Sequence, residues 1–337
     1  MSNKQKKIKI GITIGDINGI GPEVIMKSLS DSRINNFMTP VIYGSTKTLS
    51  YYRKSLNIND FNYAQVKKEN EIIDKKVNVV NCWEETIEIN VGESTQKAGF
   101  ASFKALKKAT DDLKEGVIDC IVTAPINKSN IQNEEFNFTG HTDFLTKTFE
   151  AEESLMMLVS ESLRVGLVTE HIPLKDVSKA ITNDKLAKKY RIMERSLKND
   201  FGISKPKIAV LGLNPHAGDN GLLGEEDGKV IEPFINDLKN EGKLASGPYS
   251  PDGFFASGQH KRFDGILCMY HDQGLIPFKL LAFEDGVNFT AGLPIVRTSP
   301  DHGTAYAIAG KNSASEVSMR QALFLAVDIA KKRNNIE

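Results

Sequence analysis

An alternation of strand-like apolar runs with helix-like patterns limits the fold more than any other feature. Residues 8–14 place isoleucine at every second position, which predicts a buried strand, and a glycine-rich turn leads into helical spacing at 24–29. The same succession returns at 40–44 (strand), 77–82 (strand), 98–113 (amphipathic helix) and 118–125 (buried strand). Strands that alternate with helices form parallel sheets covered by helices. The sequence therefore predicts an α/β fold.

Later stretches continue this pattern with one expected antiparallel pair. We expect a hairpin at 155–160 and 163–168, helices at 174–181, 183–200, 225–241 and 316–331, a strand at 207–213, a polar connection at 57–76 and a Gly/Pro/Ser loop at 245–255.

Length and charge narrow the class of protein. A chain of 337 residues with 40% hydrophobic residues can bury a large core and form two lobes. Lys plus Arg and Asp plus Glu both number 43, so nothing attracts nucleic acid or a membrane surface in bulk. No run approaches the roughly 18 apolar residues of a membrane span, and the short basic start is no signal peptide. We expect a cytoplasmic protein whose cysteines, Cys82, Cys120 and Cys268, are free thiols.

Three histidines stand just past apolar, strand-like runs. His171 follows 165–168, His216 follows 210–213, and His271 follows 265–269. His271 and Asp272 are expected to lead into a turn at Gly274, with Pro277 and Lys279 beyond it. Neutral imidazoles are good ligands for zinc, cobalt or manganese. The spacing alone leaves two possibilities open, which are a shared metal site and three unrelated loop histidines.

Several polar residues could bind an anion. Gly140, His141 and Thr142 precede a helical pattern at 143–149, where donors can face an anion, although Thr142 could simply cap the helix with His141 exposed. Further on, Lys279, Asn288 and Arg297 could grip a phosphate or carboxylate, or the two cations could be surface charges.

The turn at residues 15–23 is rich in glycine. Gly15, Gly19 and Gly21 allow a tight turn and a close backbone approach, which suits a phosphate or a cofactor. The spacing matches neither a dinucleotide fingerprint nor a P-loop. The alternative is an ordinary strand-to-helix turn in which Asp16 is a structural acceptor.

Taken together, these motifs resemble those of a known family. Residues 15–23, 301–305 and 308–311 resemble the metal-dependent β-decarboxylating dehydrogenases of the isocitrate and isopropylmalate type. The middle of the chain is more specific and is similar to the 4-hydroxythreonine-4-phosphate dehydrogenase (PdxA) family, in the motifs at 123–128, 140–145, 214–218 and 270–274. The resemblance covers essentially the whole chain.

The resemblance implies a two-lobed α/β/α subunit. The first lobe would comprise residues 1–130 plus 300–337, and the second, 131–299, would carry metal ligands and dimer contacts. It also implies a homodimer with the active site in the interlobe cleft at the interface, where His171 reaches into the partner's site.

The resemblance further implies the roles of particular residues. The metal ligands would be His171, His216 and His271. The substrate ligands would be His141, Thr142, Lys279, Asn288 and Arg297. The cofactor would meet Gly15, Asp16, Gly303 and Thr304. By their position in the His271 stretch, Asp272 and Lys279 are both candidates to take the hydroxyl proton, and the alternative for Asp272 is to support a metal ligand.

The implied reaction uses NAD or NADP and one divalent ion (Zn, Co, Mg or Mn). It would oxidise 4-(phosphooxy)-L-threonine to 2-amino-3-oxo-4-phosphooxybutanoate, which decarboxylates to 3-amino-2-oxopropyl phosphate in pyridoxal phosphate (vitamin B6) biosynthesis. The alternatives are a 4-phospho-D-threonate or 4-phospho-D-erythronate dehydrogenase, a phosphate acetyltransferase-like acyl transferase, and an inactive binding protein. Departures from the family pattern at Ile17-Asn18 and Tyr306-Ala307 leave NAD and NADP both open.

Overall fold

The computed structural model describes residues 7–67 and 71–336, so the basic start at residues 1–6 lies outside the described part. The chain divides into two compact units. Unit 1 is Met1–Glu150 with Pro294–Glu337, and unit 2 is Ala151–Leu293. The compact units change over at residues 150 and 294. The lobe boundaries expected at 130 and 300 stay a prediction.

Unit 1 contains a parallel sheet in the order β3-β4-β2-β1-β5-β12. Isoleucines 8, 10 and 12 of the inner strand β1 are fully buried, which confirms the expectation from their alternation. The strands are β1 (Ile8–Thr13), β2 (Met38–Gly44), β3 (Ala64–Val66), β4 (Asn78–Asn81), β5 (Cys120–Thr123) and β12 (Arg297–Pro300).

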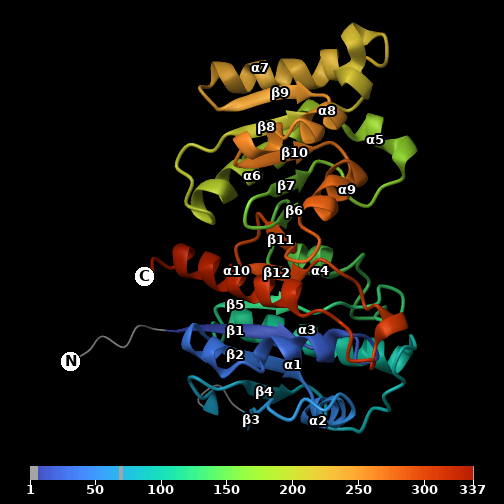
Figure 1. Cartoon of the computed structure of the whole chain (residues 1–337), viewed down its shortest axis with the longest axis vertical. Helices are drawn as coiled ribbons and strands as arrows, with labels where there is room; N and C mark the ends of the chain where they lie inside the picture. Colours follow the sequence, from blue (N-terminus) through green and yellow to red (C-terminus); the bar gives the residue numbers. More distant parts are fainter. Residues whose placement is uncertain (1–6, 68–70, 337) are drawn as a thin grey trace, which may run out of the picture. The chain divides into compact units, whose positions relative to one another are not determined.

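Helices cover this sheet, with α3 against β1, β2 and β5 and with α10 against β1, β5 and β12 (Figure 1). Both ends of the chain thus contribute to one unit. The helices are α1 (Gly21–Leu29), α2 (Thr46–Ser55), α3 (Gln96–Lys114), α4 (His141–Thr148) and α10 (Val317–Arg333), with short 3-10 segments at Ser32–Asn36 and Tyr306–Ile308.

Unit 2 contains a mixed sheet in the order β11-β6-β7-β10-β8-β9. Its β6 and β7 form the expected antiparallel hairpin, whereas β7, β10, β8 and β9 run parallel. The strands are β6 (Leu155–Val159), β7 (Arg164–Leu167), β8 (Ile208–Leu211), β9 (Ala245–Tyr249), β10 (Gly265–Cys268) and β11 (Val287–Ala291).

The two faces of β7 are covered by different helices, because successive side chains of a strand point to opposite faces. Val165 and Leu167 join a core cluster with α9, whereas a side-chain carbon at Gly166 would meet Met193 of α6. The α/β class is therefore confirmed. The helices are α5 (Leu174–Ala180), α6 (Asn183–Asn199), α7 (Glu232–Asn240), α8 (Pro251–Ala256) and α9 (His271–Leu281), with irregular helical segments at Pro215–Gly221, Asp227–Ile231 and Gln259–Arg262.

The turn expected at Gly274 is wrong, because residues 271–281 form the helix α9 with Pro277 inside it. Proline removes one helical hydrogen bond and normally ends a helix. Here Leu275, Phe278 and Ala282 lie at helical spacing and are all buried in the core cluster of unit 2. Burial of that face outweighs the helix-breaking effect of Pro277.

The loop expected at 245–255 is also wrong, since the structure has strand β9 and helix α8 there. The connection expected at 57–76 likewise contains the three-residue strand β3. Both missed strands lie at the end of a strand order. Edge strands tolerate proline and exposed polar residues, so they lack the apolar alternation by which inner strands are recognised.

Two further expectations concern the cysteines and the membrane. Cys82, Cys120 and Cys268 are free, as expected, and burial raises the pKa of the Cys82 thiol to about 12. No helix within the described residues is long and apolar enough to cross a membrane.

Candidate active site

The three strand-end histidines belong to neighbouring strands of unit 2. Strands β7, β10 and β8 are adjacent and parallel, so the segments that follow them leave the same edge of the sheet. Two side chains join these segments. The Thr169 hydroxyl donates to the Met269 carbonyl (2.7 Å). Gln273 accepts from the Met269 N–H (2.7 Å) and donates to the Gly212 carbonyl (2.7 Å).

His171 and His271 come together at this edge, with ring centroids 5.6 Å apart. The Nδ1 atom of His271 lies 2.7 Å from Oδ1 of Asp272. Because a carboxylate only accepts, Nδ1 is the donor in this contact, and in the neutral imidazole Nε2 then keeps its lone pair. A carboxylate bonded in this way fixes the tautomer and orientation of a ligating histidine.

His216 lies in an unusual backbone segment that follows β8. Residues 216–220 all have positive φ, from 43° to 82°, although only Gly218 is a glycine. Such conformations are strained for residues with a Cβ and gather at functional sites. Asp227 holds the residues just before this segment in place, because its carboxylate accepts from the N–H groups of Leu213 (2.7 Å) and Asn214 (3.0 Å).

The described residues of the single chain do not complete a metal site. Among them, no group of three or more His, Cys, Asp or Glu side chains is arranged to hold an ion. Two of the three expected ligands are adjacent, and the third leaves the same sheet edge. The donor chemistry fits a divalent ion, since Nε2 of His271 is available and its ring is already oriented.

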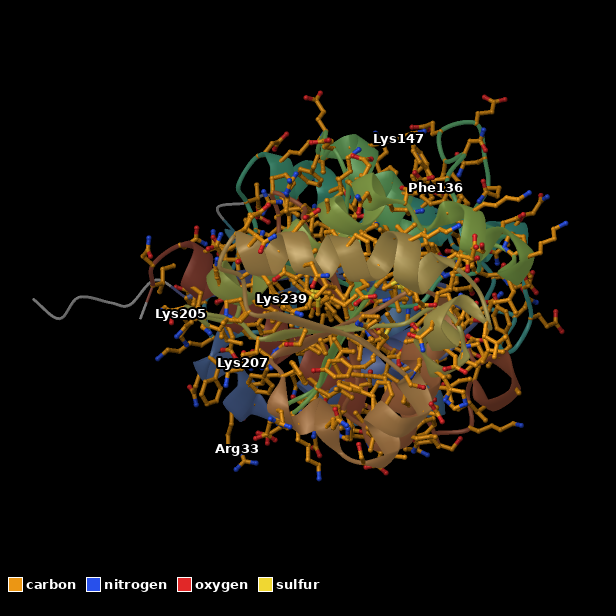
Figure 2. The ribbon with its side chains drawn as sticks, turned by 90° about the horizontal axis from the view of Figure 1, so that it is seen from above. Arg33, Phe136, Lys147, Lys205, Lys207 and Lys239 are labelled. Carbon is orange, nitrogen blue, oxygen red and sulfur yellow. The ribbon has the colours of Figure 1, made fainter. Side chains whose placement is uncertain are left out.

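Unit 1 carries two of the expected substrate ligands at the start of α4. His141 and Thr142 are its first two residues, preceded by Gly140. An aromatic cluster anchors this helix, because Phe144 of α4 packs on Phe136 with ring centroids 5.5 Å apart. Phe136 and Lys147 mark this part of the molecule in Figure 2. The helix start is thereby held in place by buried rings.

His141 is surrounded by positive charge. Its Nε2 atom is buried and has no hydrogen-bond partner. Burial, followed by the charges of Arg297 and Lys128, holds the pKa of the His141 imidazole well below its ordinary value. The side chain is therefore neutral at pH 7 and retains one enclosed ring nitrogen for a ligand.

Arg297 is itself buried in β12. Its Nε and Nη2 atoms both donate to the Thr123 hydroxyl at the end of the neighbouring strand β5, at 3.1 and 2.7 Å. Burial lowers the pKa of the Arg297 guanidinium to about 10, so it stays charged at pH 7. A buried cation beside a neutral histidine favours an anionic ligand. The motif at 123–128 gave no hint that Thr123 holds this arginine.

Two expected substrate ligands belong to unit 2. Lys279 lies on α9 and is partly exposed, two turns after His271. Asn288 lies on β11, and its Oδ1 atom is buried without a hydrogen-bond partner. An enclosed amide oxygen of this kind is available to a donor on a ligand.

The expected cofactor residues meet within unit 1. The Ile20 N–H donates to the Thr304 carbonyl (3.0 Å), and a Cβ at Gly19 would come within 2.7 Å of that oxygen. Gly15 has φ +70°, and a Cβ at Gly303 would meet nothing within 4 Å. The buried glycine-rich turn therefore packs against the 303–304 segment, which is exposed at Gly303.

Asp16, in the glycine-rich turn, is fully buried and has three donors. Its carboxylate accepts from the Asn18 N–H (2.9 Å), the Asn130 amide (2.8 Å) and the Tyr306 hydroxyl (2.7 Å). Burial and the contact with Asp16 raise the pKa of Tyr306. Asp16 thus holds the turn to two other segments, which favours the structural role that the sequence left open.

Comparison with known proteins agrees with these observations. The family model described as pyridoxal phosphate biosynthetic protein PdxA matches residues 36–326. A 4-hydroxythreonine-4-phosphate dehydrogenase from Bacteroides thetaiotaomicron is 50% identical over 98% of this chain and 91% of its own length. A candidate D-threonate 4-phosphate dehydrogenase from Oceanobacillus iheyensis is 41% identical over 96% of this chain and 98% of its own.

A solved structure is similar over the same length. The crystal structure of 4-hydroxythreonine-4-phosphate dehydrogenase from Klebsiella pneumoniae has a TM-score of 0.81 and 34% sequence identity, and the match covers 98% of this chain and 99% of that one. The sequence matches and the structural match point to the same family. This chain belongs to the PdxA family of pyridoxal phosphate biosynthetic proteins.

Proposed function

We propose that this chain is a 4-hydroxythreonine-4-phosphate dehydrogenase. It oxidises 4-(phosphooxy)-L-threonine with NAD or NADP to 2-amino-3-oxo-4-phosphooxybutanoate, which decarboxylates to 3-amino-2-oxopropyl phosphate. The cytoplasm is its expected location. Relatives with this name support the reaction. The geometric observation that carries the proposal is the His171–His271 pair, in which Asp272 orients the His271 ring.

We assign His171, His216 and His271 as ligands of one divalent ion (Zn, Co, Mg or Mn). When bound, such an ion stabilises negative charge that develops on the substrate oxygen. The family resemblance implies that His171 reaches into the site of a partner subunit. Within one chain, the rings of His171 and His271 lie 5.6 Å apart, so both could also bind the same ion. Asp272 acts through His271, which makes it a positioning residue and leaves Lys279 as the candidate for the hydroxyl proton.

The substrate phosphate is assigned to unit 1. His141 offers its enclosed Nε2, Thr142 its hydroxyl, and Arg297 a buried positive charge. Hydrogen bonds between charged donors and phosphate are about twice as strong as neutral ones. Asn288 offers an amide oxygen, which suits the substrate amino group, because that group is a donor.

The cofactor is assigned to the segment Gly303-Thr304 and to the glycine-rich turn that packs against it. A Cβ at Gly303 would meet nothing within 4 Å, so a dinucleotide can approach the backbone there. Gly15 and Gly19 allow residues 124–125 and Thr304 to pack closely on the turn, and Asp16 holds the turn in shape. The choice between NAD and NADP is part of the test.

We also propose a homodimer formed through unit 2. Large apolar side chains are exposed on the segments next to the histidine pair: Ile172, Leu174, Ile276, Leu280, Leu281 and Phe283. Exposed apolar residues that gather near a site are typical of protein interfaces. Light scattering of the purified protein tests this, and a monomer at micromolar concentration would contradict it.

The experiment that tests the function is an assay of nicotinamide reduction with 4-(phosphooxy)-L-threonine. The alternative substrates, 4-phospho-D-threonate and 4-phospho-D-erythronate, carry a hydroxyl in place of the amino group. We expect turnover of the amino substrate to be at least tenfold faster. Faster turnover of phosphothreonate would favour the second candidate, which a 41%-identical relative supports. An acyl transferase or an inactive binding protein would reduce no nicotinamide.

A further inference from the structure

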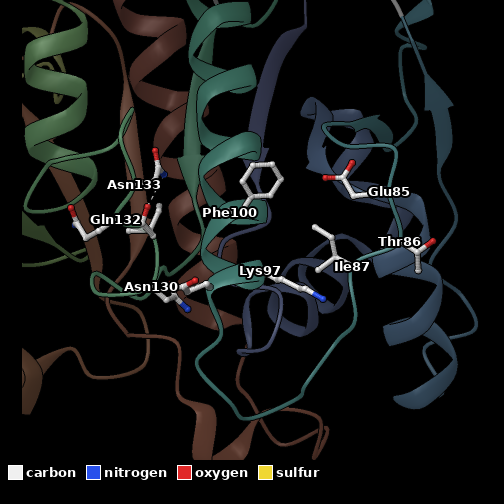
Figure 3. A pocket seen from close by; sticks show the side chains of 10 residues that line it. Glu85, Thr86, Ile87, Lys97, Phe100, Asn130, Gln132 and Asn133 are labelled. Carbon is white, nitrogen blue, oxygen red and sulfur yellow. Dashed lines mark hydrogen bonds between the residues drawn. The ribbon is translucent and has the colours of Figure 1, made fainter.

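Unit 1 has a cavity of about 580 Å³ beside the first half of α3, and none of the expected site residues lines it (Figure 3). The charged side chains that line it are Glu85 and Lys97, whose opposite signs favour neither an anion nor a cation. Its aromatic surface, Phe100, already lies under the Lys104 ammonium, which is 5.2 Å from the ring centroid. The wall of this cavity therefore selects no class of ligand.

Unit 2 instead contains a buried cation that is linked to a proposed metal ligand. Lys189 of α6 is only 6% exposed. Its ammonium donates to the Ser154 carbonyl (2.5 Å) and forms ion pairs with Glu153 (3.1 Å) and Glu170 (3.8 Å). Lysine is almost never buried unless it is paired. Because a buried ion pair adds little net stability, the geometry that it imposes is its more informative property.

Glu170 connects this cluster to His171, the next residue in the chain. Its Oε1 atom accepts from the Met156 N–H of β6 (3.3 Å). The preceding residue, Thr169, is bonded on the other side, since its N–H and its hydroxyl donate to the Met269 carbonyl at 3.2 and 2.7 Å. Strand β7 lies between β6 and β10. The segment that follows β7 is therefore held on both sides up to residue 170, and the exposed His171 comes directly after it.

The two carboxylates that meet at Lys189 come from different segments. Glu153 precedes β6, and Glu170 follows β7. Continued beyond the paired residues, the antiparallel register of β6 and β7 brings Glu153 opposite Glu170. Like charges directly opposite each other destabilise a strand pair, and an ammonium between them removes the repulsion. Without that ammonium, Glu170 is better hydrated away from Glu153, and its movement displaces the adjacent His171.

We infer that Lys189 is a positioning residue for the proposed metal ligand His171. Its charge lets Glu170 stay bonded to β6, which keeps the His171 ring beside that of His271, with 5.6 Å between centroids. Lys189 thus serves one ligand as Asp272 serves the other. The inference rests on the proposed function, because it requires that His171 binds the ion.

Titration of the full-length, metal-free protein with cobalt(II), followed by visible absorption, tests this role. We expect Lys189→Met to weaken cobalt binding by about tenfold, as loss of a group that orients a metal ligand does. Adding Glu170→Gln to Lys189→Met should recover most of that affinity, because the neutral amide still accepts from the Met156 N–H and no longer repels Glu153. A loss of packing alone would not be reversed by this second change.

Lys198→Met is the matched control on the same helix. Lys198 also pairs with a carboxylate, that of Glu194, and is 39% exposed, so this variant should bind cobalt like the wild type. Glu170→Ala loosens the same segment without a change in the interior, and it should also weaken binding by about tenfold. Thermal midpoints establish which variants fold, and Glu170→Ala carries the test if Lys189→Met does not.

Wild-type cobalt affinity in the folded variants Lys189→Met or Glu170→Ala would overturn the inference, as would a loss in Lys189→Met that Glu170→Gln does not reverse. Failure of the proposed function gives a different result. His271→Ala should weaken cobalt binding whether or not Lys189 acts on His171, so full affinity in His271→Ala contradicts the metal site itself. A wild type that binds no cobalt would contradict both.

Discussion

At the scale of single residues, His141 illustrates how burial and charge determine protonation. The folded protein holds its pKa well below the value near 6.5 of an unfolded chain. A depressed pKa contributes stability that is present above pH 6.5 and is lost as the pH falls toward the folded value, because the unfolded state then binds the extra proton.

We therefore expect the free energy of unfolding of the wild type to fall more steeply below pH 6.5 than that of His141→Asn. The difference approaches about 1.4 kcal/mol per pH unit, the contribution of one proton. Urea unfolding of both proteins at a series of pH values measures it. Parallel curves would mean that the imidazole titrates normally in the folded state.

Asp272 gives a second prediction at this scale. Its carboxylate fixes the His271 ring at 2.7 Å, so Asp272→Asn should lower metal affinity by about 10- to 100-fold while the protein still folds. Competition with a chromophoric chelator measures the affinity. Asp237→Asn on α7 is the matched control. Full metal affinity in Asp272→Asn would remove the positioning role.

At the scale of elements, α9 carries His271 and packs closely on the strands below it. A Cβ at Gly274 would lie 2.8 Å from Leu167 Cδ2 and Val165 Cγ1 and 3.2 Å from Cys268 Sγ. We expect Gly274→Ala to lower the free energy of unfolding by about 1–3 kcal/mol, as overpacking does, and to reduce activity through displacement of α9.

Gly253 of α8 provides the matched comparison, because a Cβ there would meet nothing within 4 Å. Gly253→Ala should be neutral or stabilising by up to about 1 kcal/mol. Chemical unfolding of the two variants distinguishes the effects. Equal stability of both would show that α9 can shift without loss.

Elements with a buried, regular pattern were predictable from the sequence. Strand β1 and the β6–β7 hairpin have apolar runs of the right length, and both are confirmed. The edge strands β3 and β9 were missed, because edge strands accept proline and polar side chains and so need not show the apolar alternation of an inner strand. Helix α9 was missed because Pro277 is a local signal, whereas the burial of Phe278 depends on the folded core.

The candidate site shows the same division. The strand-end position of the histidines was readable, because parallel strands place their carboxyl ends at one edge. The left-handed segment at 216–220, the brace by Asp227 and the link from Thr123 to Arg297 were not readable. Each depends on residues that are distant in sequence or on backbone angles that residue type alone does not dictate.

At the scale of the whole molecule, the two units carry complementary chemistry. Unit 2 holds the histidine pair with Asp272, and unit 1 holds His141 and the buried charge of Arg297. The proposed reaction needs both, since a metal without the phosphate contacts leaves the substrate unplaced.

The most direct test of the account is a spectrophotometric measurement of NAD reduction by the purified protein with 4-(phosphooxy)-L-threonine. The measurement is made before and after treatment with a chelator and after a divalent ion is restored. We predict activity that falls at least a hundredfold with the chelator, returns with the ion, and fails to return in His271→Ala. Undiminished turnover in the chelator-treated protein, or full recovery in His271→Ala, would contradict the histidine-centred site.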